Sequence, residues 1–244
     1  MPKINLTCLK KTELATKIYF IQMGSDTELN FKPGQFISLE VAPREYRSYS
    51  LINLKTQASH DQEHPTIIEF LVNTKSGGLG SQCFESMNIG ENYAGLGPLG
   101  KFALIENTRP KVFIATGTGL GPFVGMINQV FAQDPKASIQ LYFGVYSPEY
   151  DFSHQFFTEY LNNSNYPNFK IITCADSLNP NQATLTDTYL GKVTEILPKF
   201  VSDFQAFDFY ICGNPLMVAA MESSLRESGA DENIFMEKYE SLAK

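Results

Sequence analysis

Residues Arg47-Ser48-Tyr49-Ser50 place a cation, an aromatic ring and a hydroxyl group within four positions. The forked guanidinium of an arginine can hold a pyrophosphate. Tyr49 offers a rigid face for stacking, and Ser50 can hydrogen-bond a ring nitrogen. Because Arg47 and Tyr49 are two residues apart, their side chains point the same way in an extended segment. The segment suits a flat, redox-active ligand that carries phosphates, and ordinary decoration of a surface strand is the alternative.

Two glycine-rich segments are candidate phosphate sites. Residues 117–122, GTGLGP, follow an apolar run and open a helical pattern, so close backbone approach and a helix N-terminus both favour an anion there. This pattern differs from the G-x-G-x-x-G dinucleotide fingerprint, and a structural strand-to-helix turn is the alternative. Residues 76–81, SGGLGS, enter another short helical segment and could hold a different phosphate through Ser81 and backbone N–H groups, unless they form only a flexible loop.

A third motif, residues 212–215 (CGNP), stands at the end of the apolar run 209–211. Ligands of doubly wound sheets bind beyond the carboxyl ends of the strands. Cys212 is therefore well placed to touch a ligand, with Pro215 opening the next helix. A buried cysteine at a turn is the alternative.

Composition limits the classes of protein to which the chain can belong. The 244 residues, 43% hydrophobic and 18% charged, predict one large or two small globular domains. A net charge of −7 disfavours nucleic acid and anionic membranes as partners. No apolar run approaches the length of a membrane span, and the first residues are not those of a signal peptide, so we expect a cytoplasmic protein. The four cysteines, by their spacing, fit neither a zinc site nor an iron–sulfur cluster.

The first half of the sequence predicts a small antiparallel barrel. Strands are expected at 17–22, 35–41, 66–73 and 101–105, separated by turns at 23–26, 32–34 and 95–98. The polar stretch 56–65, which includes His60 and His64, is expected to be a solvated loop.

The second half predicts a parallel sheet with helices on both faces. A plausible linker at 107–110 precedes strands expected at 111–115, 139–145, 170–174 and 207–212. Helices are expected at 123–132, 151–162, 191–197 and 215–228. This alternation is typical of α/β domains.

In this order and spacing, the motifs resemble those of the ferredoxin–NADP reductase superfamily of flavoproteins. The resemblance spans nearly the whole chain and is carried by residues 33–36, 47–50, 78–81, 97–102, 117–122, 191–194, 212–215 and 235–239. It implies an antiparallel six-stranded flavin-binding barrel over residues 1–106. It also implies a parallel-sheet α/β domain for the nicotinamide nucleotide over residues 107–244.

The resemblance also implies residue roles. Arg47 would pair with the flavin pyrophosphate, Tyr49 would pack on the isoalloxazine ring, and Ser50 would lie near its N5. Cys212 would pack near the nicotinamide, and Glu237 would assist proton movement at the flavin edge, so the implied catalytic residues are Ser50, Cys212 and Glu237. Tyr239 or Phe235 would shield the flavin. The implied cofactor-binding residues are Arg47, Ser48, Tyr49, Ser50, Phe70, Leu71, Val72, Asn73, Gly78, Leu79, Gly80, Ser81, Gly117, Thr118, Gly119, Leu120, Gly121, Pro122, Tyr146, Cys212, Gly213, Asn214, Pro215 and Tyr239.

The implied activity is hydride transfer from NAD(P)H to FAD, or to FMN as an alternative, followed by electron release to a separate ferredoxin, flavodoxin or oxygenase component. The sequence lacks the four clustered cysteines of an iron–sulfur domain, and we expect a monomer. Candidate basic residues for docking an acidic acceptor are Lys10, Lys11, Lys17, Arg44 and Lys101. Reduction of free flavin or small acceptors, and a flavin-binding subunit without turnover, are the alternatives.

The sequence favours NADH over NADPH. After the run 143–145, residues 146–149 contain no arginine for a 2′-phosphate, and Glu149 and Asp151 would repel one. Residues 173–177 also lack a cation. The alternative is a cation supplied from elsewhere in the chain.

Overall fold

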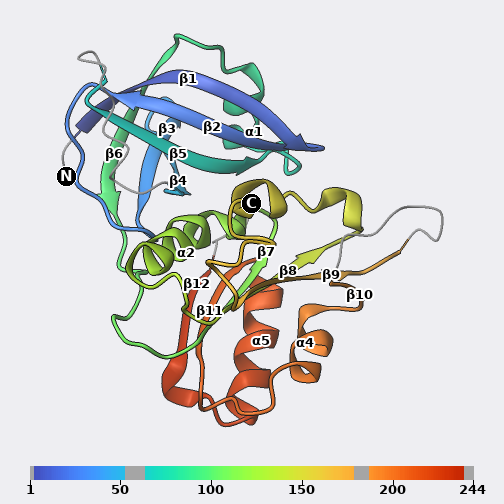
Figure 1. Ribbon diagram of the computed structural model, residues 1–244. Helices are drawn as coiled ribbons and strands as arrows, with labels where there is room; N and C mark the ends of the chain where they lie inside the picture. Colours follow the sequence, from blue (N-terminus) through green and yellow to red (C-terminus); the bar gives the residue numbers. More distant parts are fainter. Residues whose placement is uncertain (1–2, 53–63, 179–186, 239–244) are drawn as a thin grey trace. The chain divides into compact units, whose positions relative to one another are not determined.

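The computed structural model describes residues 3–52, 64–178 and 187–238 (Figure 1). The chain forms two compact units, Met1–Leu104 with Gly121–Gln129, and Ile105–Leu120 with Val130–Lys244. Within the described residues, each unit contains one six-stranded sheet.

The sheet of the first unit is antiparallel, with the order β4-β3-β6-β1-β2-β5. Its strands are β1 (Lys3–Ala15), β2 (Ile18–Ser25), β3 (Phe36–Ala42), β4 (Glu45–Ser50), β5 (Thr66–Asn73) and β6 (Asn92–Leu99). A bridge between Leu51 and Phe70 joins the chain after β4 to β5, the other edge of the sheet. Helix α1 (Leu79–Ser86) lies between β5 and β6 in the sequence. The expected antiparallel barrel is confirmed.

The barrel is filled by the inward side of its alternating strands. At the start of β1, Ile4, Leu6 and Cys8 are buried, whereas Lys3 and Asn5 between and before them are exposed. This period of two is what a strand with one face on a core requires.

The sheet of the second unit is parallel, with the order β10-β9-β8-β7-β11-β12. Its strands are β7 (Lys111–Thr116), β8 (Ile139–Val145), β9 (Phe169–Ala175), β10 (Thr188–Leu190), β11 (Asp208–Gly213) and β12 (Ile234–Lys238). The α-helices after Leu104 are α2 (Gly121–Gln133), α3 (His154–Phe157), α4 (Val193–Ile196) and α5 (Pro215–Glu227). Short 3-10 helices are η1 (Gly117–Leu120), η2 (Pro148–Tyr150), η3 (Leu197–Lys199) and η4 (Asp231–Asn233).

The burial of this sheet is typical of a parallel sheet. Every residue of β11 is buried, as expected of a central strand covered on both faces. Helices α4 and α5 pack against one face of the sheet (Figure 1). The expected α/β unit is therefore confirmed.

Several expected element boundaries are wrong. Residues 101–105 are irregular, and the strand lies earlier, in β6, which includes the expected turn 95–98. A Cβ on Gly95 would lie 3.1–3.3 Å from the side chains of Leu6, Ile4 and Ile37, so this glycine serves close packing rather than a turn.

Strand β2 runs through most of the expected turn 23–26, because Met23 is a buried core residue. The expected helix 151–162 is reduced to α3, since its apolar positions are aromatic rings fixed in a cluster. Phe157 and Tyr160 both pack on Phe169, and Asn162 has a positive φ of 58°. Most of the expected loop 56–65 lies outside the described residues.

Candidate functional site

The Arg47–Ser50 motif forms the end of β4, at one edge of the barrel sheet. Arg47 Nη1 donates to the Tyr46 carbonyl at 2.7 Å and pairs with Glu45 at 3.3 Å. The Tyr49 ring stacks on Phe70, with centroids 5.4 Å apart, and meets the edge of Phe84 at 4.9 Å. Burial raises the pKa of Tyr49, so the phenol stays neutral. The motif thus presents a neutral, rigid ring beside an arginine, while Ser48 is exposed and Ser50 is buried.

The second glycine cluster lies directly against this motif. A Cβ on Gly80 would lie 2.7 Å from the Tyr49 hydroxyl and 3.6 Å from Arg47 Cγ. No side chain among the described residues caps helix α1 at Gly78, and the Ser76 and Ser81 hydroxyls hydrogen-bond each other at 2.9 Å. The first amides of a helix have no partner within it and favour an anion. Arg47, Tyr49 and the start of α1 therefore form a cradle suited to a ligand with a flat ring and a diphosphate.

Most of the expected ligand-binding side chains of strand β5 are buried in the barrel. The side chains of Phe70, Leu71 and Val72 are buried, and Phe70 and Val72 belong to the barrel core. Asn73 is exposed, and its Oδ1 accepts the Lys75 amide at 2.9 Å. Contacts of residues 70–72 with a ligand would thus come from main-chain groups.

In the second unit, the GTGLGP and CGNP motifs pack against each other. A Cβ on Gly119 would lie 2.6 Å from the carbonyl carbon of Cys212 and from Gly213 Cα. Gly213 has φ of +139°, and its Cβ would meet Thr116. The Asn214 amide donates to Thr116 Oγ1 at 3.0 Å, and Asn214 Oδ1 caps α5 by accepting the Leu216 amide at 2.9 Å. Two motifs about 95 residues apart thereby form one corner at the carboxyl ends of β7 and β11.

The remaining residues of GTGLGP divide between the two units. Gly117, with φ of +53°, and Thr118 lie in η1. Leu120 is buried, and Pro122 occupies the first turn of α2. Gly121 belongs to the first unit, where its Cβ would lie 3.2 Å from Ile52 Cγ2.

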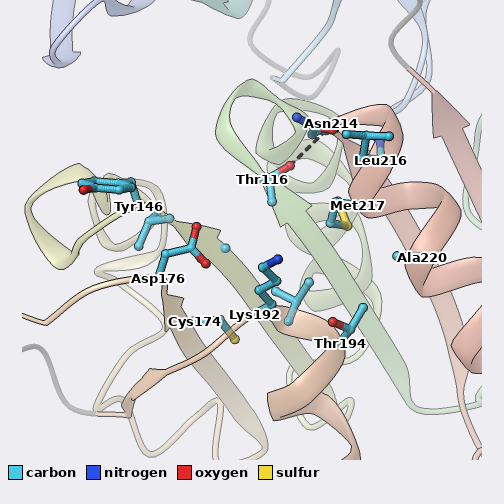
Figure 2. Close-up of a pocket in the computed structure, with 13 residues that line it drawn as sticks. Thr116, Tyr146, Cys174, Asp176, Lys192, Thr194, Asn214, Leu216, Met217 and Ala220 are labelled. Carbon is cyan, nitrogen blue, oxygen red and sulfur yellow. Dashed lines mark hydrogen bonds between the residues drawn. The ribbon is translucent and has the colours of Figure 1, made fainter.

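Beside the corner in the second unit lies a pocket of about 420 Å³ (Figure 2). It is lined by the ends of β7, β8 and β9, by the segment after β10 and by the start of α5. The residues that line it are Thr116, Gly144, Val145, Tyr146, Cys174, Asp176, Lys192, Val193, Thr194, Asn214, Leu216, Met217 and Ala220. Tyr146 and Asn214 are site residues expected from the sequence.

The pocket also contains two charged residues that the expected site lacked. Asp176 follows β9, and Lys192 follows β10. The expectation that residues 146–149 and 173–177 supply no cation stands, but Lys192 brings one from elsewhere. Neither Glu149 nor Asp151 lines the pocket; the Asp151 side chain is fully buried. The sequence signals for Asp176 and Lys192 are their places in segments 173–177 and 191–194, the second of which carries part of the family resemblance.

Cys212 and Glu237 are register neighbours on the parallel strands β11 and β12, so the structure brings these two expected catalytic residues together. Cys212 is buried and Glu237 is half-buried. Ser50 belongs to the other unit. Phe235 stacks on Tyr210, with centroids 5.0 Å apart. Tyr239 lies outside the described residues.

Family models and relatives support one assignment. Residues 4–104 match the Oxidoreductase FAD-binding domain, and residues 113–223 match the Oxidoreductase NAD-binding domain. The anthranilate 1,2-dioxygenase electron transfer component of Acinetobacter baylyi is 32% identical over 222 residues, which are 87% of this chain and 59% of that protein. The toluate 1,2-dioxygenase electron transfer component of Pseudomonas putida is 30% identical over 226 residues, 91% of this chain and 63% of that protein.

Solved structures agree in fold. A cytochrome P450 reductase from Amycolatopsis has a TM-score of 0.86 at 24% identity, covering 99% of this chain and 71% of that one. A ferredoxin–NADP+ reductase from Plasmodium falciparum has a TM-score of 0.73 at 19% identity, covering 97% and 96%. The chain spans about three fifths of the length of the two dioxygenase components. With a FAD-binding domain match on its barrel and a NAD-binding domain match on its parallel sheet, the chain belongs to the oxidoreductases that combine these two domains, and it shares the fold of the ferredoxin–NADP+ reductase.

Proposed function

We propose that the protein is an NAD(P)H-dependent flavin oxidoreductase that takes hydride from NADH in preference to NADPH and passes electrons from FAD to a separate ferredoxin, flavodoxin or oxygenase component. The observation that carries the proposal is the close approach of Gly80 to Tyr49 and Arg47, which leaves no room for a Cβ and places the uncapped start of α1 beside the arginine and the aromatic ring. The two relatives named as dioxygenase electron transfer components support a separate acceptor. The proposal also includes a cytoplasmic location, a monomeric state and a domain boundary near residue 106.

Each unit has a distinct task in this proposal. Arg47 and the first amides of α1 would hold the pyrophosphate, and Tyr49 would form one wall for the ring. When bound, the flavin would accept the two electrons of the hydride and release them to an acceptor either one at a time or as a pair. The close backbone at Gly119 and Gly213 would position the nicotinamide beside Cys212, and Glu237 would move a proton.

The primary test is reduction of the FAD-loaded protein without oxygen. We expect NADH to bleach the flavin absorbance at lower concentration than NADPH. A colourless protein that takes up neither FAD nor FMN would contradict the proposal. Electron delivery is then measured with a ferredoxin, a flavodoxin and free flavin as competing acceptors, and fastest turnover with free flavin would overturn the separate protein acceptor.

Replacement of Cys212 by alanine tests the hydride step. Cys212→Ala and Ser50→Ala should each slow flavin reduction by NADH while the protein still binds FAD, because these side chains would orient the reacting rings, whereas Arg47 and the start of α1 would supply most of the affinity for FAD. Stopped-flow absorbance measures the rate, and FAD titration measures binding. Bleaching at the wild-type rate in both variants would rule these roles out.

A further inference from the structure

We propose that Asp151 is a positioning residue for the nucleotide pocket. Together with Ser153 and Thr173 it forms a buried group, here called the Asp151 clamp, which ties the chain after β8 to strand β9. The inference rests on the proposed function, because it concerns how the pocket receives a nicotinamide nucleotide.

The clamp is a fully buried and well-satisfied carboxylate. Asp151 Oδ1 accepts the Ser153 amide at 2.8 Å and the Ser153 hydroxyl at 2.6 Å, and Oδ2 accepts the Thr173 hydroxyl at 2.5 Å. Ser153 and Thr173 are both fully buried, as is the Asp151 side chain. Burial of a carboxylate is costly unless donors surround it, so this arrangement strongly fixes the two segments to each other.

The two segments that the clamp joins also carry one wall of the pocket. Tyr146 stands five residues before Asp151, and Asp176 stands three residues after Thr173; both line the pocket. Further bonds connect them, because the Val145 carbonyl accepts the Asp176 amide at 3.1 Å. The Tyr146 carbonyl accepts the Ser177 amide at 2.9 Å and its hydroxyl at 3.2 Å. The clamp and these bonds make residues 145–153 and 173–177 one rigid wall.

The wall presents groups whose position decides binding. Tyr146 is 69% exposed although it lines a pocket, so its ring is available to a flat base, and Figure 2 shows it at the pocket beside Asp176. The exposed Tyr146 side chain is not held by burial, whereas its backbone is held by the hydrogen bonds from Ser177 to its carbonyl and by the clamp that follows it in the chain. Loss of the clamp would free the backbone and misplace the ring and the Asp176 carboxylate. Because neither Cys212 nor Gly119 lines the pocket or belongs to the clamp, the hydride step would keep its geometry.

The test compares Thr173→Val, Thr173→Ser and Asp151→Asn in the FAD-loaded protein. Thr173→Val removes only the hydroxyl that bonds Asp151, and we expect KM for NADH and Kd for NAD+ to rise by about fivefold to tenfold, with kcat changed by less than about twofold. Thr173→Ser keeps the hydroxyl and should recover most of the affinity. Asp151→Asn should resemble Thr173→Val.

The control is Asp208→Asn. Asp208 is a buried carboxylate at the opposite end of β11, bonded to Arg109 and Asn107. The Asp208→Asn substitution should lower the Tm of the protein without changing the KM for NADH. Equal KM in Thr173→Val and wild type, or an equal rise in Asp208→Asn, would overturn the clamp's role in positioning. A wild-type protein that is reduced by neither NADH nor NADPH would instead contradict the proposed function itself.

Discussion

A single residue, Gly80, is expected to decide whether FAD can bind. Gly80→Ala should weaken FAD binding by about tenfold or more, because a Cβ there cannot coexist with the Tyr49 hydroxyl at 2.7 Å without moving the ring or the helix start. Gly78→Ala is the matched control, since the nearest atom to its Cβ would be 3.8 Å away. FAD titration by fluorescence quenching measures both, and equal losses would rule out the Gly80–Tyr49 contact as the cause.

Asp176 and Lys192 carry opposite charges in the pocket, so we expect their replacement to affect nucleotide binding in different ways. Asp176→Asn should narrow the preference for NADH over NADPH, because a carboxylate in the pocket repels a 2′-phosphate. Lys192→Met should raise KM for both nucleotides, since the ammonium would face phosphate groups that both carry, and Lys192→Arg should raise it less. Steady-state kinetics with each nucleotide measure these effects. A loss confined to NADPH in Lys192→Met would assign the ammonium to the 2′-phosphate instead.

Among the secondary-structure elements, helix α1 depends on a lysine from β1. Lys11 Nζ donates to the carbonyls of Glu85 and Met87, at 2.9 and 3.2 Å, and so satisfies the helix C-terminus. Lys11→Met should lower the free energy of unfolding by about 0.5–1 kcal/mol. The same substitution should also weaken FAD binding, because the first amides of α1 would hold the pyrophosphate of FAD. Urea unfolding and FAD titration measure the two effects.

The neighbouring lysine provides the control for this change. Lys10 Nζ lies 5.6 Å from the Phe20 ring centroid and is exposed, so Lys10→Met should leave α1 intact. Equal destabilisation by both changes would contradict the capping role. Lys17 also has a structural partner, because it pairs with Glu85 at 2.5 Å and thereby lowers the Glu85 pKa. Lys11 and Lys17 thus have local tasks, which weakens their candidacy as docking residues for an acidic acceptor.

The sequence predicted elements best where hydrophobic period and neighbouring turns agree. Strands β7, β8 and β9 and helix α5 fall within one or two residues of expectation, because their apolar runs are short and continuous or have clear helical spacing. Strand β10, of three residues, and the edge strand β12 carry too little pattern to be found. Strand β6 was missed because its glycines, read as turn signals, are sites of close strand packing.

The residues of the candidate site also differ in how far they could be predicted from the sequence. Motifs contained in four to six consecutive residues, such as Arg47–Ser50 and Gly117–Pro122, could be found from local chemistry. Segments 173–177 and 191–194 were singled out, but the shared pocket of Asp176 and Lys192 could not be predicted, because it depends on the order of β8, β9 and β10 in the sheet. Glu149 and Asp151, which were expected to repel a 2′-phosphate, do not line the pocket, and the Asp151 carboxylate accepts the Thr173 hydroxyl instead.

For the molecule as a whole, buried tyrosines make the stability of the fold decrease at high pH. Burial raises the pKa of Tyr49, Tyr142 and Tyr160, and raises that of Tyr210 to about 12. The unfolded chain releases these protons near pH 10, whereas the folded protein keeps them, so this stability is fully present below about pH 10 and is lost as pH rises above it. Urea midpoints at about pH 8 and about pH 11 should show a marked decrease. A flat profile would contradict tyrosine burial as a source of stability.

The contact between Gly119 and the Cys212–Gly213 backbone has a consequence for redesign. Each motif fills the space that a side chain on the other would need, and Thr116 occupies the place of a Cβ on Gly213. Residues 116–119 and 212–214 therefore have to be substituted together, although almost a hundred positions separate them in the sequence. A library that randomises either segment alone should return mostly parental residues there, whereas a graft that transfers both segments together keeps their packing.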